Sequence, residues 1–554
     1  MAELKTFYDK QQKIWSGPRV APLHNIEHHS IGRILFGQMR LNPHNVLQID
    51  AFDNTQATSG ELLTWGIRIA LHLKKLRMRH DDIVGVAARN TLKLTSVVLG
   101  CLFNGNPMHA VNPNYQEAAI SHSFGITKPQ IIFCDGCDYE KIRKITASFQ
   151  PTIYTMCDHI QGVPTILDLL EPTKMERFYQ PEKQVLGGDQ TIVILSSSGT
   201  TGLSKAVTVS ASKITLENAF SNIDEVFYTS SGIDWASGFM SLLQNCYTGC
   251  TRIINRKPFN APDFIEMVKK YKITTAILGP IQFVELLDCP DFTSENMASL
   301  QLVTSGGGYV SKQLVERVQR VLPQCMLCIA YGLTETGAVT INVGVQENNS
   351  VGKLIPNVQL RIIDEEGRSL GPNQTGEILV RLPNCSWAGY YGNPIETQKM
   401  MDSLGWYHTG DLGYVDEEGY LYIVDRIKDI LKYNRMQYWP GEIENTIREL
   451  PDVADCCVVG IYNERYGDVA GALVMKKSGS PLTTEQVVEH VRNRLREPQK
   501  QLHHGAFFVE KLPQNINGKI LKREAREILK SFLEQSSSSS AALLSSSSSL
   551  SLDR

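Results

Sequence analysis

The sequence predicts an α/β protein with a large N-terminal body of several layered α/β subdomains and a smaller α+β C-terminal domain. Three observations support this prediction. Helix and strand periodicities alternate from about residue 60, the pattern changes after residue 425, and a Ser-rich segment ends the chain. The 554 residues have room for about three or four domains, or for one large enzyme body with an appendage.

The N-terminal half alternates amphipathic helices with β-branched strands. Leu62, Ile69 and Leu73 recur at the spacing of one helix face, and the run IVGVAA follows at 83–88. A second helical stretch, TLKLTSVVLGCLF, precedes two further strand-like runs, MHAVNP and QIIFC. Repeated helix-then-strand order predicts a mainly parallel sheet that is covered on both faces.

The pattern changes after the strand-like run GYLYIVD at 419–425. A helix through PGEIENTIREL comes next, followed by strands around DCCVVGIY and GALVMKK. Thr483 and Gln486 have the spacing of a capping box that opens another helix. These elements predict a compact α+β domain.

We therefore expect a large domain at 1–425, a small domain at 426–533 with a hinge near 425–428, and a disordered tail at 534–554. The tail reads QSSSSSAALLSSSSSLSLDR from Gln535. Such a composition buries too little apolar surface to offset the entropy of ordering the chain.

Charge and hydropathy exclude several classes of partner. Lys and Arg total 55 against 58 Asp and Glu, so neither a basic face for nucleic acid nor a polybasic lipid anchor is predicted. The first residues, MAELKTFYDKQQKIW, lack the layout of a signal peptide, and no window has the roughly 18 consecutive apolar residues of a membrane-spanning helix. We expect a cytoplasmic protein that binds small molecules; the sequence predicts no oligomeric state.

The twelve cysteines leave one alternative open. The pairs Cys134/Cys137 and Cys325/Cys328 have the CxxC spacing of zinc ligands. Both pairs adjoin apolar strand-like runs and lie far apart in the sequence, so we favour reduced, buried thiols over a tetrathiolate zinc site.

Residues 191–205 read TIVILSSSGTTGLSK, a strand-like run that breaks into hydroxyls, glycines and a lysine. A Walker phosphate loop is excluded, because the second glycine counted from Gly199 would fall at Ser204, and Lys205 is followed by another strand rather than a helix. Taken alone, the segment could be a polar surface turn. Its composition nevertheless suits polyphosphate, because glycine N–H groups, hydroxyls and one cation can surround an anion.

Five further motifs follow the serine loop in order: TSGGGYV at 304–310, YGLTET at 331–336, YHTGDLG at 407–413, VDRIKDILKY at 424–433 and NGK at 517–519. Together they resemble the adenylate-forming superfamily, which includes acyl-CoA synthetases, 4-coumarate–CoA ligases, beetle luciferases and peptide-synthetase adenylation domains. The resemblance runs from about residue 25 to 530. It is nearest to the insect luciferase-like and coumarate-ligase-like branch.

The resemblance implies that a carboxylate attacks the α-phosphate of ATP and that pyrophosphate leaves. It implies a cradle for the β- and γ-phosphates made by Ser198, Thr200, Thr201 and Lys205. In YGLTET, Tyr331 would lie against adenine, Thr334 would contact the α-phosphate, and Glu335 would bind Mg²⁺, which favours carboxylate and phosphate oxygens.

The other implied positions surround the base, the ribose and the reacting atoms. Three glycines would let the backbone approach base and substrate: Gly306, Gly307 and Gly308. Asp411 and Arg426 would hold the ribose hydroxyls. Lys519 would stabilise charge at the α-phosphate during adenylation. The small domain would be mobile and would rotate about Lys428 after adenylation, so that Lys432 serves the second half-reaction with coenzyme A.

Some positions depart from the family pattern. The usual Pro and Gly around the phosphate-loop lysine are Ser204 and Ala206, a change that we expect to be tolerated. A pocket segment near HHGFG aligns with DWASG at 234–238, counting back from Gly249. The acyl-pocket positions are then Trp235, Ser237 and Gly238. A bulky indole in place of histidine predicts a different acid or a shorter pocket and weighs against luciferin oxidation; a core tryptophan is the alternative.

Arg435 stands where relatives usually have glycine, in the coenzyme A region that also contains Gln437. The arginine could obstruct coenzyme A or pair with one of its phosphates. The chain ends in Leu552-Asp553-Arg554 rather than a Ser-Lys-Leu-type tripeptide, so this signal for peroxisomal import is not predicted.

The resemblance therefore predicts an ATP-dependent carboxylic acid:CoA ligase for a fatty or other apolar acid, using ATP, Mg²⁺ and coenzyme A. One alternative is an adenylate-forming enzyme with another second step, such as luciferase-type oxygenation or transfer to a carrier protein. Another is a non-catalytic relative that binds nucleotide or acyl ligands. Intact Lys205, Glu335, Asp411 and Lys519 argue against the latter.

Overall fold

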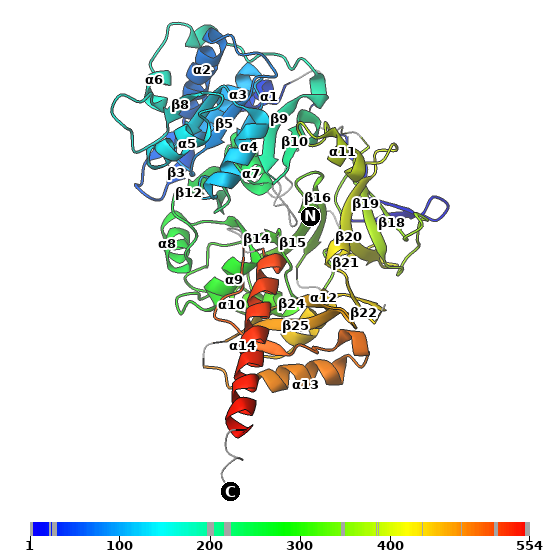
Figure 1. Ribbon diagram of the computed structural model, residues 1–554. Helices are drawn as coiled ribbons and strands as arrows, with labels where there is room; N and C mark the ends of the chain where they lie inside the picture. Colours follow the sequence, from blue (N-terminus) through cyan, green and yellow to red (C-terminus); the bar gives the residue numbers. More distant parts are fainter. Residues whose placement is uncertain are drawn as a thin grey trace.

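The computed structural model describes residues 4–21, 24, 30–196, 204–214, 216, 223–344, 349–383, 385, 387–434, 436–477, 479–514 and 519–548, with side chains to 535. Its large N-terminal body and smaller C-terminal domain confirm the predicted fold class (Figure 1). The body contains sheets of six, nine and six strands, and the small domain adds a sheet of five.

The first sheet confirms the helix-then-strand prediction. Its order is β10-β9-β6-β5-β7-β8, and all neighbours are parallel except the hairpin β9–β10. The strands are β5 (Val84–Ala87), β6 (Met108–Ala110), β7 (Ile131–Cys134), β8 (Thr152–Thr155), β9 (Thr191–Ser196) and β10 (Ala206–Ser210). The helices of this region are α2 (Ser59–Lys75), α3 (Leu94–Asn104), α4 (Glu117–Thr127), α5 (Tyr139–Ile145) and α6 (Ile166–Leu169).

In the second sheet, neighbouring strands are parallel in the spatial order β3-β12-β11-β13-β14-β15. Antiparallel strands lie at both edges, β4 beside β3 and β16 beside β15. Its strands are β3 (Val46–Asp50), β4 (Gln56–Thr58), β11 (Val226–Thr229), β12 (Thr251–Ile254), β13 (Thr275–Leu278), β14 (Leu302–Gly306), β15 (Met326–Leu333), β16 (Gly337–Val343) and β17 (Lys353–Leu354). The associated helices are α1 (Ile31–Met39), α7 (Ala236–Thr248), α8 (Ala261–Tyr271), α9 (Pro280–Leu287) and α10 (Lys312–Val321).

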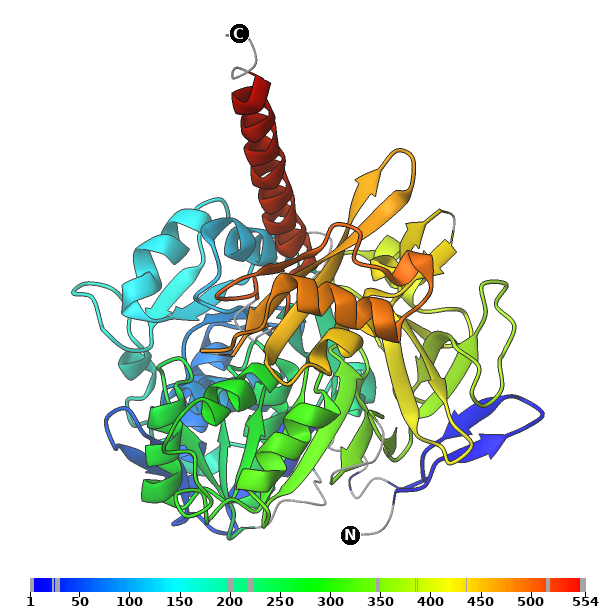
Figure 2. The same ribbon diagram turned by 90° about the horizontal axis from the view of Figure 1, so that it is seen from below.

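The third sheet is antiparallel and joins the two ends of the large body. Its strands are β1 (Phe7–Asp9), β2 (Ile14–Ser16), β18 (Gln359–Ile363), β19 (Gly376–Arg381), β20 (Tyr407–Val415) and β21 (Leu421–Arg426). The N-terminal hairpin pairs with β18 across more than three hundred residues (Figure 2). Helix α11 (Pro394–Met400) lies between β19 and β20 in sequence. Only β21 of this sheet is predicted from the sequence.

The small domain contains the four predicted elements, α12, β24, β25 and α13, together with four that were not predicted. They are β22 (Leu431–Tyr433), β23 (Met436–Tyr438), α12 (Pro440–Arg448), β24 (Val453–Asn463), β25 (Gly467–Lys476), α13 (Thr484–Arg494), β26 (Ala506–Phe508) and α14 (Lys522–Ser548). The capping box of Thr483 and Gln486 opens α13 as predicted.

The predicted disordered tail differs from the structure, because α14 continues through the serines to Ser548. The start of this helix is anchored by Ala525 and Leu529, which are buried against the small-domain sheet. Once a helix is nucleated, each added residue gains one hydrogen bond, and serine is only modestly less favourable than alanine. Burial alone, from which the disordered tail is predicted, does not include this propagation.

The two CxxC pairs adjoin strands of different sheets: Cys134 ends β7, Cys325 directly precedes β15, and Cys328 lies near the start of β15. Among the described residues, which include all twelve cysteines, no three His, Cys, Asp or Glu side chains are grouped as a metal site requires. Burial raises the pKa of Cys325 to about 12 and that of Cys328 to about 11, which favours the thiol form. No helix in the described part of the chain could cross a bilayer.

Candidate active site

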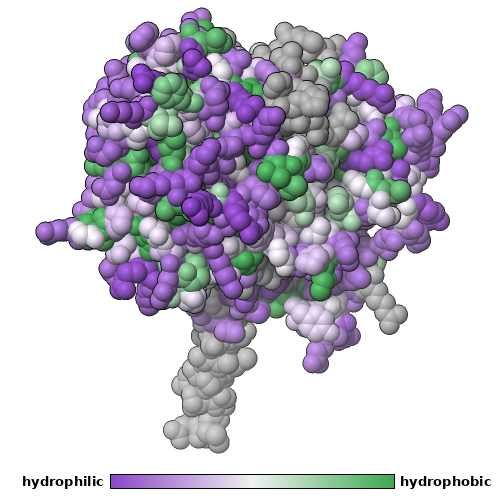
Figure 3. All heavy atoms as spheres, turned by 90° about the horizontal axis from the view of Figure 1, so that it is seen from above, coloured by the Kyte–Doolittle hydropathy of each residue, from purple (hydrophilic) through white to green (hydrophobic). Residues whose placement is uncertain are grey.

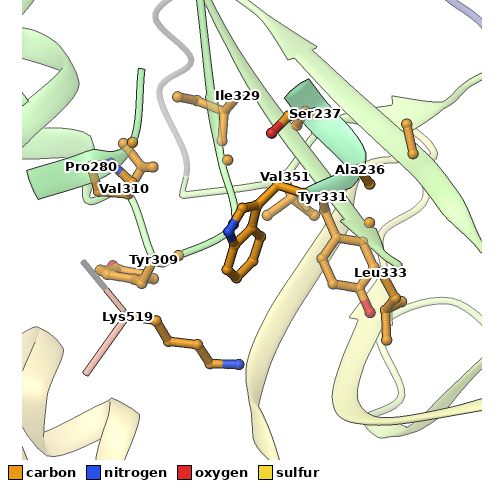
Figure 4. Close-up of a pocket in the computed structure, with 18 of the residues that line it drawn as sticks. Ala236, Ser237, Pro280, Tyr309, Val310, Ile329, Tyr331, Leu333, Val351 and Lys519 are labelled. Atoms are coloured by element: carbon orange, nitrogen blue, oxygen red, sulfur yellow. The ribbon is translucent and has the colours of Figure 1, made fainter. Parts of the chain in front are cut away.

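A cavity of about 3900 Å³ lies between the large body and the small domain. Residues from all of the sheets line it. One face of the molecule shows scattered rather than contiguous apolar side chains (Figure 3). Inside the cavity, Lys519 extends from the small domain toward the space that is also lined by Tyr309 and Tyr331 of the body (Figure 4). The motifs therefore meet at one site although they are distant in sequence.

Asp411, Arg426 and Tyr331 form a hydrogen-bonded cluster on one wall of this cavity. Asp411 on β20 lies directly across from Arg426 on β21, and the Arg426 Nε is 2.7 Å from Asp411 Oδ1. The Tyr331 hydroxyl donates to Asp411 Oδ2 over 2.6 Å. Burial raises the pKa of Asp411 above its usual value, although Arg426 and Tyr331 oppose this effect. The cluster holds a carboxylate in a fixed position.

Glu335 occupies the turn between β15 and β16, directly after Thr334, and only 9% of its surface is exposed. The Tyr390 hydroxyl donates to Glu335 Oε1 over 2.8 Å, and the Tyr407 hydroxyl lies 3.3 Å from that of Tyr390. Burial and the Glu335 charge raise the pKa of both tyrosines. Both therefore stay protonated and able to donate. Sequence reasoning did not single out Tyr390, which adjoins no recognised motif.

Lys205 immediately precedes β10, where the return strand of the serine loop was predicted. Its ammonium is 2.6 Å from Glu396 Oε2 and 4.7 Å from the centre of the Tyr390 ring. Glu396, on the first turn of α11, was not predicted to contribute to the site. The predicted cradle residues Ser198, Thr200 and Thr201 lie outside the described residues.

Lys519 lies in a cationic part of the cavity. Burial lowers its pKa to about 8, and the charges of Arg426 and Lys428 contribute to the decrease. Asp411 and Asp429 act in the opposite direction. Lys428 lies on the short 3₁₀ turn Ile427–Asp429, and its pKa is also lowered by burial and by Arg426. Several cations therefore converge near Asp411, where an anionic ligand would be stabilised.

The predicted glycines permit close backbone approach around the cavity. A Cβ on Gly306 would lie 2.6 Å from the carbonyl oxygen of Ala330. Gly307 has a φ of +79°, which L side chains rarely adopt. Gly308 lines the cavity beside Pro280. Larger residues at the first two positions would distort the end of β14.

Trp235 lines the cavity as the residue before α7, so the structure places it on the wall rather than in a core. The Ser237 hydroxyl donates to that of Ser231 over 3.0 Å. Gly238 lies in the first turn of α7, where a Cβ would be 2.0 Å from the Gly232 carbonyl oxygen, so this close approach requires a glycine. Asp234 is buried beside Trp235, and burial raises its pKa to about 6 despite a hydrogen bond from Asn112.

Lys432 and Gln437 pair across the hairpin β22–β23, and both are exposed. Neither is among the described residues that line the cavity. Arg435, between them, lies outside the described residues. The structure therefore separates Lys432 and Gln437 from Lys519, which lines the cavity.

A specific contact joins the small domain to the body next to Lys519. The Arg448 guanidinium lies over the ring of Tyr309 at 5.0 Å and pairs with Asp455 at 3.0 Å. Lys522 lies 3.7 Å from Asp425 and 3.8 Å from Asp429, on either side of the predicted hinge. These contacts orient the small domain with Lys519 facing the cavity.

Comparisons with known proteins find relatives along most of the chain. The model of the family "AMP-binding enzyme" matches residues 36–391, and that of the "AMP-binding enzyme C-terminal domain" matches 442–519. The chain is 29% identical to luciferin 4-monooxygenase of Photinus pyralis, covering 94% of this chain and 97% of the relative. It is 28% identical to 4-coumarate-CoA ligase 1 of Narcissus pseudonarcissus, covering 86% and 90%.

Among solved structures, ATP-bound MatB from Rhodopseudomonas palustris superimposes with a TM-score of 0.81 at 24% identity. The match covers 91% of this chain and 99% of that chain. At this identity the likeness establishes a shared fold.

Proposed function

The chain belongs to the AMP-binding enzyme family, and we propose that it is an ATP-dependent carboxylic acid:CoA ligase. It activates a fatty or other apolar carboxylic acid as an acyl-adenylate and then transfers the acyl group to coenzyme A. The observation that carries this proposal is the convergence of Lys519 with Asp411, Arg426 and Tyr331 in one cavity. The Lys519 ammonium thus shares one cavity with the fixed Asp411 carboxylate, and we assign adenylation to the first and ribose binding to the second.

In the first step, a carboxylate oxygen of the acid forms a bond to the α-phosphorus of ATP while the bond to pyrophosphate breaks. The protein has no covalent role in this step and contributes positioning and charge. Asp411 and Arg426 hold the ribose, Tyr331 and the glycines at 306–308 position the base, and Lys519 stabilises negative charge between acid and α-phosphate. Lys205 binds the departing phosphates after it leaves Glu396.

Glu335 fits a magnesium site of the kind that nucleotide enzymes use. Mg²⁺ is commonly held by one or two carboxylates together with substrate phosphates, so a single buried carboxylate is sufficient. The described residues offer no larger cluster of protein ligands, which is consistent with a metal that arrives with ATP. When bound, Mg²⁺ neutralises phosphate charge. Tyr390 orients the carboxylate by donating to Oε1.

The walls near Trp235 support an apolar acid. Figure 4 shows mainly apolar side chains around this part of the cavity, including Ala236, Pro280, Val310, Ile329, Leu333 and Val351. Burial of a hydrocarbon chain contributes about 0.8 kcal/mol per methylene group. Trp235 narrows the space and sets the length or shape of the acid.

The second step requires another orientation of the small domain. The thiol sulfur of coenzyme A attacks the acyl carbon, the thiol proton is lost to solvent, and AMP leaves. Rotation about 425–428 withdraws Lys519 and brings the hairpin with Lys432, Arg435 and Gln437 to the cavity. The exposed position of Lys432 outside the cavity is consistent with this sequence of events.

The test is pyrophosphate release from ATP across a panel of fatty and aromatic acids, each with and without coenzyme A, with acyl-CoA measured by mass spectrometry. The proposal predicts acid-dependent release that rises with coenzyme A, together with a thioester of one acid class. If pyrophosphate release is the same with and without coenzyme A, the enzyme carries out a different second step and is not a coenzyme A ligase. Absence of release with every acid would contradict the proposal as a whole.

A further inference from the structure

Lys213 is a cavity residue to which the recognised motifs assign no role. It ends the 3₁₀ turn Ala211–Lys213, which directly follows β10, the return strand of the serine loop. Its ammonium donates to the main-chain oxygen of Glu335. The side chain therefore reaches from the phosphate-loop hairpin to the turn that carries Thr334 and Glu335.

The side chains around Lys213 provide it with an aromatic ring and a neutral thiol rather than an ion-pair partner. Its ammonium lies 5.3 Å from the centre of the Trp387 ring, and the nearby Cys385 thiol donates to the Ser212 carbonyl over 3.0 Å. Burial raises the pKa of Cys385, so the sulfur stays neutral. Within the described residues no carboxylate lies within ion-pair distance of Lys213; the Glu335 carboxylate, whose charge opposes the effect of burial on the Lys213 pKa, accepts a hydrogen bond from Tyr390.

An ammonium group has three N–H donors, and the structure gives one of those of Lys213 an acceptor. Lys213 is partly buried, and removing a cation from water without an ion-pair partner costs free energy. A ligand anion in the cavity would supply both the charge and the missing acceptors. Lys213 thus has the chemical requirements of an anion-binding group.

Lys205 and Lys213 each lie over one ring of the aromatic pair Tyr390 and Trp387, and both line the cavity. Lys205 lies over Tyr390 at 4.7 Å and Lys213 over Trp387 at 5.3 Å, and the two ring centres are 5.1 Å apart. Glu335 adjoins the same aromatic pair through Tyr390. The two lysines can therefore contact neighbouring oxygens of one extended anion.

We propose that Lys213 is a second cation of the nucleotide-phosphate site, which binds phosphate oxygens of ATP together with Lys205. This inference rests on the proposed nucleotide site and extends it to a residue outside the motifs. The ammonium keeps its bond to the Glu335 carbonyl and directs its other N–H groups to the phosphate. Lys213 thereby couples phosphate binding to the position of Thr334 and Glu335.

The test compares ligands that differ only in phosphate. Dissociation constants of ATP, AMP and adenosine are measured calorimetrically, without acid or coenzyme A, for the wild type, Lys213→Met and Lys213→Arg. Charge-assisted hydrogen bonds contribute about 1.5–3 kcal/mol, so Lys213→Met should weaken ATP binding about ten- to hundredfold. Adenosine binding should not change, and Lys213→Arg should restore most of the ATP affinity because it retains the charge.

Lys270→Met is the matched control, because Lys270 also lies over an aromatic ring, at 4.9 Å from Tyr271, but is exposed and outside the cavity lining. Its ATP affinity should equal that of the wild type. Weaker AMP binding by Lys213→Met would assign the contact to the α-phosphate, and unchanged AMP binding with weaker ATP binding would assign it to the leaving phosphates; both support the inference.

Equal loss of ATP and adenosine binding in Lys213→Met would show that Lys213 only maintains the Glu335 turn, and it would overturn the inference. Unchanged ATP affinity would overturn it as well. If Lys213→Met does not fold, wild-type-like binding of ATP by Lys213→Gln, which removes the charge but keeps a donor, would likewise contradict it. Because no acid is present, Lys213-dependent ATP binding without pyrophosphate release in the panel assay would refute the ligase and leave this inference standing.

Discussion

Lys519 and Lys432 lie on the same small domain, yet their environments are opposite. Lys519 is inside the cavity, where burial and two neighbouring cations lower its pKa to about 8. Lys432 is exposed on β22, outside the cavity lining, and its main-chain N–H donates to Asp468. One domain thus presents one lysine to the site and holds the other away.

This difference indicates how two reactions can share one cavity. In this structure, Arg448 contacts Tyr309 and Lys522 pairs with Asp425. These two contacts hold the face of the small domain that carries Lys519 against the cavity. Under the proposed function, this is the arrangement for adenylation, and the Lys432 side serves the thioester step only after rotation. The comparison predicts that variants on the two sides affect different steps.

The largest effect is expected for Lys519→Ala. Loss of an electrostatic stabiliser of the transition state typically costs about 10²–10³ in rate, so acid-dependent pyrophosphate release should fall by that factor or more. ATP binding should survive, because Asp411, Arg426 and Lys205, which we assign to binding ATP, remain. Calorimetric ATP binding measured beside turnover separates the two, and unchanged turnover would remove Lys519 from the reaction.

Lys432→Ala is the counterpart on the other side. Acyl-CoA formation should decrease about tenfold, as for loss of one charge-assisted contact, whereas single-turnover formation of acyl-adenylate should keep its wild-type rate. Quenched-flow analysis of adenylate and thioester reports each step. Equal slowing of both steps would mean that the two sides of the domain are not specialised.

The pH dependence of kcat/KM for ATP tests whether Lys519 must be charged. The required form is the cation, whose fraction falls as pH rises through a pKa of about 8, so kcat/KM for ATP should fall about tenfold per pH unit well above that value. The profile is best measured in Lys213→Arg, because burial also lowers the pKa of Lys213, to about 7, and arginine stays charged. A flat profile up to pH 9.5 would contradict a catalytic Lys519 cation.

A smaller effect is expected at the domain contact. Arg448→Ala removes the cation over Tyr309, a type of interaction that contributes about 0.5–2 kcal/mol, so adenylation should slow about two- to thirtyfold. The thioester step should change less, because that contact must break for rotation. Tyr309→Leu, which keeps an apolar side chain without the aromatic face, should reproduce the effect; a faster first step would argue against the contact as a stabiliser.

The smallest change in rate, but a change in selectivity, is expected for Trp235→Gly. Removing the indole enlarges the wall near Ser237 and should shift the preferred acid toward longer or bulkier chains. Relative kcat/KM values for acids of increasing length measure this shift. An unchanged order of preference would place Trp235 outside the acid pocket.

Much of the fold was predictable because its signals are local. The apolar faces of α2, the β9–β10 hairpin and the Thr483 capping box depend on residues that are near one another in sequence. The N-terminal hairpin of the third sheet was missed because β2 pairs with β18, which is more than three hundred residues away. The helical extension of α14 was missed because helix propagation depends on an anchor upstream of the serines.

The residues of the candidate site also divide into those with a local sequence signal and those whose contacts depend on long-range packing. Asp411, Arg426 and Tyr331 were predicted because each lies in a recognisable motif, and the structure brings them within hydrogen-bonding distance. Glu396 and Lys213 were not predicted, because their contacts with Lys205 and the Glu335 turn exist only in the folded chain. Placement in a motif therefore identified part of the site, and packing supplied the rest.

The most direct test of the central claim is exchange of labelled pyrophosphate into ATP, measured with a preferred acid and without coenzyme A. Exchange requires reversible formation of an acyl-adenylate and is independent of any second step. The account predicts acid-dependent exchange by the wild type and by Lys432→Ala, and loss of exchange in Lys519→Ala. Exchange that is absent from the wild type with every acid, or that persists in Lys519→Ala, would contradict it.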